Sequence, residues 1–182
     1  MLQENLIKIY ETSFRDNREM PALTDYFKGE TFSYYEMAKE VAKLHLLFKK
    51  AGIRQGDKIA LIGRNNPRWC ITYIATITYG AVIVPILQDF TPADIIHIIN
   101  HSESRMLFLG DNFWDNIEEE QIRQIEAVFS LTDFHTIYGS GSTGGSWWCW
   151  ARCCCCLRWA FCHSRKTFSL CGLTRLDKAA NF

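Results

Sequence analysis

The chain has 182 residues, of which 48% are hydrophobic and 22% charged, and its 20 basic and 20 acidic side chains give a formal net charge of zero. This length suffices for one domain with a buried core and is short for two. The charge balance provides no electrostatic basis for binding nucleic acid or an anionic membrane, and no apolar run reaches the ~20 residues that span a bilayer.

The overall balance conceals two regions of opposite charge. Residues 1–138 carry 14 basic and 19 acidic side chains, whereas residues 139–182 carry six and one. Seven of the eight cysteines and four of the six tryptophans also lie in the second region. The first region contains only Cys70 and begins without a basic-then-apolar leader, which is typical of a cytoplasmic protein. We therefore expect a cytoplasmic domain over residues 1–138.

An amphipathic helix and a hairpin open this domain. Apolar side chains recur at helical spacing through residues 5–18, which predicts a helix with one buried stripe. Two short segments, 22–26 and 31–32, flank a Lys-Gly pair, a pattern typical of a β-hairpin. Ser33 and Glu36 then form a capping box, which predicts the start of a second helix.

The middle of the domain alternates strands and helices. Three short apolar segments have the composition of strands buried on both faces of a sheet, namely residues 58–63, 81–85 and 106–109. The intervening helices have clear starts, because Asn66 precedes Pro67 and Thr91 precedes Pro92. Gly80 supplies a left-handed stop for the first of these two helices.

The last part of the domain is predicted to complete the sheet. Residues 111–126 are rich in charge and predict an exposed helix, with the run Glu118–Glu120 facing solvent. Residues 127–132 are expected to return to the sheet. Because strands alternate with helices through short links, the fold class is α/β, with a partial doubly wound, mostly parallel sheet and flanking helices.

Residues 139–182 do not continue this pattern. A Gly/Ser run is followed by a Trp- and Cys-rich run that includes Cys153–Cys156 and shows no helical or strand period. Tryptophan and cysteine codons both begin with TG, so a one-base shift of a Val- and Leu-coding stretch produces such runs. We interpret this segment as an unstructured tail of frameshifted or chimeric origin.

The cysteines and histidines of the chain do not favour a metal site or a catalytic triad. Cys149, Cys153 and Cys156 meet the spacing of zinc ligands only loosely, so chance enrichment is the favoured interpretation. Three histidines have no Ser, Cys or carboxylate at a triad-like spacing and are interpreted as surface or boundary residues: His45, His97 and His101. The sequence thus predicts no catalytic residue and no metal site.

Several segments of the domain resemble the adenylate-forming synthetases. The segments that carry the resemblance are Thr31–Met37, Gly56–Leu61, Arg64–Trp69, Gly80–Ile86 and Thr91–Ile95. They occur in order and at family-like spacing, and within the superfamily they are most similar to the long-chain fatty acid–CoA ligases. The resemblance runs from about residue 22 to 109, with an extension to Tyr138, and covers the N-terminal part of a family member.

The resemblance implies a two-step reaction. A carboxylate attacks the α-phosphate of ATP to give an acyl-adenylate and pyrophosphate, and the thiolate of coenzyme A then displaces AMP. Mg²⁺ and cationic groups stabilise the charge on the transferring phosphoryl group. The family's residues for these steps follow the matched segments, which are therefore interpreted as scaffold. The implied partners are ATP, Mg²⁺, coenzyme A and a small-molecule fatty acid, with membrane contact peripheral at most and the fragment alone inactive.

One segment resembles the family's phosphate loop, roughly Y-T-S-G-T-T-G-x-P-K-G, a glycine-rich turn whose N–H groups cradle phosphate. The residues that would contact a nucleotide are Ser140, Gly141, Ser142, Thr143 and Gly144. Trp147 stands where the family has lysine, and the segment follows Pro85 sooner than the family loop does. Two alternatives stay open: a small nucleotide-binding module that uses Gly139–Gly145, and a non-functional truncated product.

Overall fold

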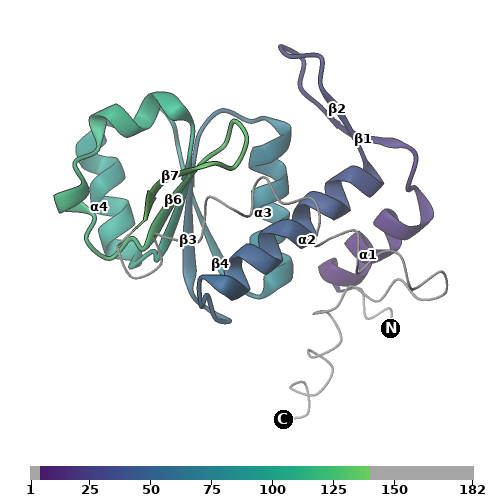
Figure 1. Ribbon diagram of the computed structural model, residues 1–182, viewed down its shortest axis with the longest axis horizontal. Coiled ribbons are helices and arrows are strands. Elements are labelled where there is room, and N and C mark those ends of the chain that lie inside the picture. The colour runs from purple at the N-terminus through teal and green to yellow at the C-terminus, as the bar shows by residue number, and fades with distance from the viewer. Residues whose placement is uncertain (1–4, 140–182) are drawn as a thin grey trace, which may run out of the picture.

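The structure is a computed structural model that describes residues 5–139. Its core is a five-stranded sheet with the strand order β4-β3-β5-β6-β7 (Figure 1). The strands of this sheet are β3 (Lys58–Ile62), β4 (Val82–Ile86), β5 (Met106–Leu109), β6 (Ala127–Ser130) and β7 (Thr136–Gly139). Strands β3, β4, β5 and β6 are parallel to one another, whereas β7 runs antiparallel to β6. The mostly parallel α/β sheet predicted from the sequence is confirmed.

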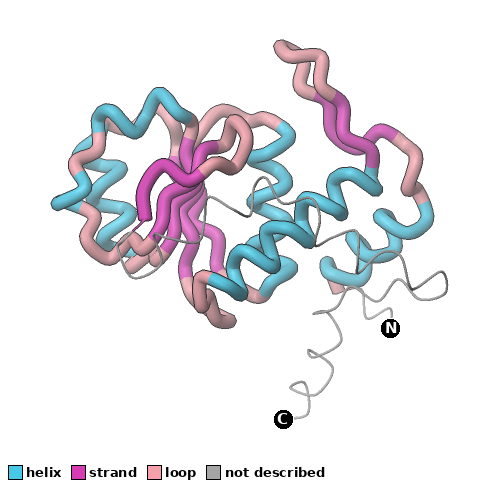
Figure 2. The backbone as a smooth tube through the Cα atoms, in the orientation of Figure 1, coloured by secondary structure: helices cyan, strands magenta, loops and turns pink. Residues whose placement is uncertain are grey.

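Within residues 5–139, four α-helices and a hairpin accompany the sheet. The helices are α1 (Leu6–Asp16), α2 (Tyr34–Lys50), α3 (Pro67–Tyr79) and α4 (Pro92–Ser102), and the hairpin pairs β1 (Pro21–Thr24) with β2 (Thr31–Ser33). Figure 2 shows helices on both sides of the strands, and in Figure 1 the hairpin projects away from the sheet. All four helices begin where the sequence predicts, because a side-chain oxygen at Asn5, Ser33, Asn66 or Thr91 accepts a backbone N–H of the first turn.

Two separate hydrophobic clusters cover the two faces of the sheet. Along a strand, successive side chains point to opposite faces, so Ile59 and Leu61 enter one cluster while Ala60 and Ile62 enter the other. We call the first face, covered by α1, α2 and α3, the α2–α3 face. The second, covered by α4 and the segment 111–125, is the α4 face. Figure 1 shows α3 and α4 on opposite sides of the strands.

The segment between β5 and β6 differs from its prediction. An exposed α-helix over 111–126 is wrong, because this stretch contains two short 3₁₀ helices, η1 (Asp111–Asn116) and η2 (Glu119–Gln121). Its apolar side chains are buried, namely Ile117, Ile122 and Ile125. Their spacing of five and then three residues does not define one stripe of an α-helix. The run Glu118–Glu120 is exposed, as predicted.

β4 forms one edge of the described sheet. Val82 donates its N–H to the carbonyl of Asp57 at 2.8 Å, so every second residue from Val82 bonds toward β3. Pro85 falls on the alternate register, with its backbone directed to the outer edge. Because proline has no N–H, this register presents fewer donors to an added strand.

Among residues 5–139, no helix combines the length and the apolar character needed to cross a membrane.

Candidate functional site

The carboxyl edge of the parallel strands is the place where open α/β sheets bind ligands. Strand β3 lies between β4 and β5, and the chain leaves β3 for the α2–α3 face but leaves β4 for the α4 face. Open sheets of this kind form their crevice at the point where the winding reverses. In this chain that point lies between the carboxyl ends of β3 and β5.

Two glycines meet at this crevice. Gly63 follows β3 and Gly110 follows β5, and the N–H of Gly110 donates to the carbonyl of Ile62 at 3.0 Å. A Cβ atom added to Gly63 would lie 2.8 Å from Cδ1 of Leu131, too close for an undisturbed contact. The φ angle of Gly63 is +157°, which residues with a side chain rarely adopt, so the backbone as well as the neighbouring Leu131 favours glycine here. No local sequence pattern predicts this contact, because Leu131 lies far along the chain from Gly63.

The polar groups near the crevice are mostly engaged in holding the scaffold. The side chain of Asn66 accepts the N–H of Trp69 at 2.8 Å and caps α3. Arg68 donates through both terminal nitrogens to the carboxylate of Glu30, at 2.9 and 3.1 Å, and so ties α3 to the hairpin. The Arg68 guanidinium lowers the pKa of Glu30. Within residues 5–139, Arg64 is exposed and makes no ion pair.

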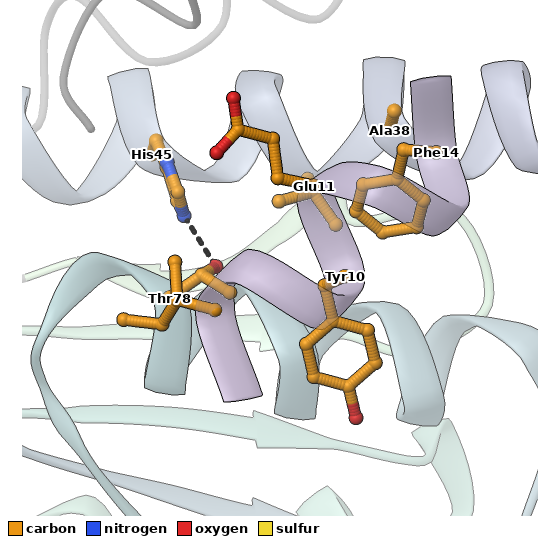
Figure 3. Close-up of a pocket in the computed structure, with 8 residues that line it drawn as sticks. Tyr10, Glu11, Phe14, Ala38, His45 and Thr78 are labelled. Atoms are coloured by element: carbon orange, nitrogen blue, oxygen red, sulfur yellow. Dashed lines mark hydrogen bonds between the residues drawn. The ribbon is translucent and has the colours of Figure 1, made fainter. Parts of the chain in front are cut away.

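A small recess lies between α1, α2 and α3 on the α2–α3 face (Figure 3). Its volume is about 20 Å³, which is room for about one water molecule. The side chains around it are mostly apolar: Ile7, Tyr10, Glu11, Phe14, Ala38, Val41, His45 and Thr78. A nucleotide or an acyl chain does not fit this volume.

His45 is the histidine that lines this recess. Its Nε2 lies 3.0 Å from the carbonyl oxygen of Ala75 and 3.0 Å from Oγ1 of Thr78. Figure 3 draws the contact with Thr78 as a dashed line. Burial lowers the pKa of His45, against the opposing effect of the Ala75 carbonyl, so the ring is neutral at pH 7. A neutral ring donates Nε2–H to Ala75. His45 is therefore a boundary residue that joins α2 to α3, in agreement with its interpretation from the sequence.

A second group of charges lies at the opposite edge of the sheet, where the parallel strands begin. Arg105, just before β5, donates to the carboxylates of Asp57 and Glu126 and to the carbonyl of Gly52. The distances to Glu126 are 2.7 and 2.9 Å, and the distance to Gly52 is 3.1 Å. These contacts occupy the guanidinium and tie the starts of three strands together. The cluster is scaffold, and sequence reasoning missed it.

Burial would raise the pKa of Asp57, but two other contacts prevail. The N–H of Arg54 and the guanidinium of Arg105 both stabilise the Asp57 carboxylate, so that its pKa lies below the ordinary value. The pKa of Arg105 is correspondingly raised, chiefly by its hydrogen bonds to Glu126. Both groups are therefore charged at neutral pH, and the cluster is a stable set of ion pairs.

The phosphate-loop residues predicted from the sequence, Ser140, Gly141, Ser142, Thr143 and Gly144, lie outside the described residues and stay a prediction. The same holds for the tail cysteines and for the domain boundary after residue 138. The residue before this loop is described: Gly139 pairs with Ala127 at the start of β6. Strand β7 thus ends at the edge where the parallel strands begin, opposite the crevice between β3 and β5.

Residues 10–139 match the family model for the AMP-binding enzymes. The chain belongs to this family. The match covers all five strands of the sheet together with α2, α3 and α4. The resemblance to adenylate-forming synthetases stated from the sequence is confirmed at this level.

Curated relatives of this chain include two kinds of ligase. It is 26% identical over 123 residues to the fatty acid–acyl-carrier-protein ligase ScoC of Streptomyces coeruleorubidus, covering 68% of this chain and 24% of the relative. It is 35% identical over 86 residues to the crotonobetaine/carnitine–CoA ligase of Proteus mirabilis, covering 47% and 17%. The chain therefore spans about a quarter or less of the length of the relatives that it matches.

Solved structures share the fold. The anthranilate CoA ligase AuaEII, in complex with anthranoyl-AMP, aligns with a TM-score of 0.65 and 19% identity over 71% of this chain and 25% of that chain. A Mycobacterium tuberculosis fatty acyl CoA synthetase aligns with a TM-score of 0.63 and 17% identity over 69% and 26%. The described sheet thus has the architecture found in the N-terminal part of acyl- and aryl-CoA ligases.

Proposed function

We propose that this chain is the N-terminal part of a cytoplasmic, ATP-dependent acid–CoA ligase, and that the acid is a long-chain fatty acid. The complete ligase would form an acyl-adenylate from the acid and ATP and then transfer the acyl group to coenzyme A. The observation that carries the proposal is the family match over residues 10–139, which includes the whole five-stranded sheet. Fatty-acid relatives among the matched proteins support the choice of acid.

The described residues act as scaffold in this proposal. Arg68 is held in an ion pair with Glu30, and Arg105 with Asp57 and Glu126. The recess beside His45 is too small for a nucleotide. Within residues 5–139, no group of three or more His, Cys, Asp or Glu side chains could hold a metal ion. In this proposal ATP, Mg²⁺ and coenzyme A are held by other parts of the ligase. The role of residues 10–139 is to support the crevice between β3 and β5.

A chimera tests this role. Residues 10–139 replace the equivalent segment of a fatty acyl-CoA synthetase, and ATP–pyrophosphate exchange is measured with palmitate. We expect measurable exchange, because the segment supplies architecture that the family shares. The matched control is the same chimera with Gly63→Val, which strains a backbone at φ +157° and crowds Leu131, and so destabilises the crevice. A chimera that is folded by circular dichroism but inactive would contradict the proposal.

The full chain provides the complementary test. We expect no pyrophosphate exchange and no heat of ATP binding in isothermal titration calorimetry. If ATP binds, and if Gly141→Ala and Thr143→Ala abolish that binding, the chain is instead a nucleotide-binding module built on Gly139–Gly145.

The acid is tested on the complete ligase, read from the gene beyond the codon for Tyr138. Palmitate, octanoate and benzoate are compared by the ratio kcat/KM. A preference for benzoate or octanoate would overturn the long-chain assignment and leave the ligase assignment intact.

A further inference from the structure

Two histidines lie one turn apart on the solvent-facing side of α4. His97 and His101 are exposed, whereas Ile95 and Ile99 on the other side of the same helix are buried against the sheet. Residues four apart on a helix are surface neighbours. The two imidazole centroids are 5.9 Å apart, and the ring planes differ by only 10°. Both rings therefore project in parallel from one rigid support.

These rings differ from the other two histidines in the described part of the chain. His45 bonds to Ala75 and Thr78, and His135 bonds to Asp133. His97 and His101 contact each other and have no hydrogen bond or ion pair with residues 5–139. A histidine with a structural role normally engages a ring nitrogen as His45 does. Relative to that pattern, the pair on α4 leaves its nitrogens available to an external ligand.

Imidazole nitrogens suit Zn²⁺, Cu²⁺ and Ni²⁺, whereas Mg²⁺ and Ca²⁺ prefer oxygen. Two imidazoles on one helix chelate, because binding of the first nitrogen holds the ion at high effective concentration near the second. His101 lies in the last turn of α4, where the negative end of the helix dipole favours a cation. We propose that His97 and His101 form a surface site for one divalent transition-metal ion of this nitrogen-preferring group.

The geometry sets the character of this site. Metal–nitrogen bonds of about 2.0–2.1 Å require the two rings to turn toward each other, and the exposure of both side chains leaves room for that rotation. Two protein ligands leave the remaining coordination positions to water or to an external ligand. The site is therefore an open one, unlike the closed four-ligand sites that hold structural zinc.

Calorimetric titration of the untagged full chain with Ni²⁺ tests the proposal. The cysteines are first alkylated with iodoacetamide, because thiolates bind the same ions. We expect His97→Asn and His101→Asn each to weaken one binding event by at least about tenfold, since either change destroys the chelate. His135→Asn is the matched control, because it removes another exposed histidine and leaves the α4 pair intact.

Thermal unfolding provides a second measurement. An ion that bridges one turn of the native helix stabilises the folded chain, so Ni²⁺ is expected to raise the Tm of the wild type and of His135→Asn but not of the two α4 variants. The proposal is overturned if the α4 variants titrate like the wild type. It is equally overturned if only one of them weakens binding, or if His135→Asn weakens binding as much.

Discussion

The two faces of the sheet are covered in different ways. On the α2–α3 face, capped helices pack against an aromatic group in which Phe108 contacts Phe48, Phe129 and Phe134, with centroid distances of 5.2 to 6.2 Å. On the α4 face, one helix and the irregular segment 111–125 contribute isoleucines to a single cluster, and Ile117, Ile122 and Ile125 lie outside both 3₁₀ helices. The first cover consists of regular helices with periodic apolar stripes, whereas in the second only α4 carries its own start signal. The second depends on contacts between segments that are distant in the sequence.

This difference explains which elements could be predicted. Ser33 with Glu36 and Asn66 with Pro67 are local signals, and both helices begin where these pairs indicate. The segment 111–126 has the charge of an exposed helix, but its conformation is held from outside. Asn100 donates to the carbonyl of Gln121 at 2.9 Å, and Gln124 donates to the carbonyl of Ile99 at 3.2 Å. The sequence of residues 111–126 alone does not predict these hydrogen bonds to α4.

The largest expected effect tests the aromatic packing of the α2–α3 face. Phe108 is fully buried in the middle of the sheet, and we expect Phe108→Ala to lower the free energy of unfolding by about 3–5 kcal/mol. Ile122→Ala on the α4 face should cost less, toward the lower end of about 2–5 kcal/mol, because its irregular segment can relax into the cavity. Urea unfolding followed by circular dichroism measures both. An equal or larger loss for Ile122→Ala would show that the two faces are equally rigid.

The ion cluster around Arg105 links the starts of β3, β5 and β6, whose side chains contribute to both faces of the sheet. Its side chains are partly exposed, so we expect Arg105→Ala to lower the free energy of unfolding by about 1–3 kcal/mol. Arg105→Lys should restore only part of the loss, because an ammonium cannot reproduce the forked contacts with two carboxylates. Full recovery with lysine would show that Arg105 contributes only its positive charge and that its forked hydrogen bonds add no stability.

The same cluster predicts a dependence on pH. The folded-state pKa of Asp57 is depressed, so the stabilisation is present above the ordinary aspartate pKa of about 3.9 and is lost as the pH falls through the folded-state pKa. The stability of the wild type should therefore decline below about pH 4 more steeply than that of Arg105→Ala. Urea titrations between pH 3 and 7, compared for the two proteins, measure this difference.

A smaller effect tests the local signal that starts α2. Ser33 accepts the N–H of Glu36 at 3.2 Å, and Glu36 accepts the N–H of Ser33 at 2.8 Å. We expect Ser33→Ala to lower the free energy of unfolding by about 1 kcal/mol, because two backbone donors lose their partners or their geometry. Ser33→Asp is the control and should remain close to the wild type, since a carboxylate also caps a helix. Thermal unfolding of the wild type, Ser33→Ala and Ser33→Asp measures these differences in stability.

The candidate ligand site was less predictable than the fold. The phosphate-loop resemblance at Ser140–Gly144 lies outside the described residues, so its role stays a prediction. The crevice between β3 and β5 depends on Gly63 meeting Leu131 and on Gly110 bonding to Ile62. A glycine in a sequence indicates freedom of the backbone, but the sequence does not reveal which distant side chain packs against that glycine in the fold.

The smallest expected effect concerns how the irregular segment of the α4 face is held. Gln124 bonds to Asn100 at 2.6 Å and to the Ile99 carbonyl at 3.2 Å, so Gln124→Ala should cost about 0.5–1.5 kcal/mol. Glu119 is exposed, and Glu119→Ala should change stability by less than about 0.5 kcal/mol. Amide hydrogen exchange over residues 111–126 should accelerate only in Gln124→Ala. Equal acceleration in both variants would mean that the segment is stabilised by its own charges, as the sequence alone suggests, and that α4 does not hold it.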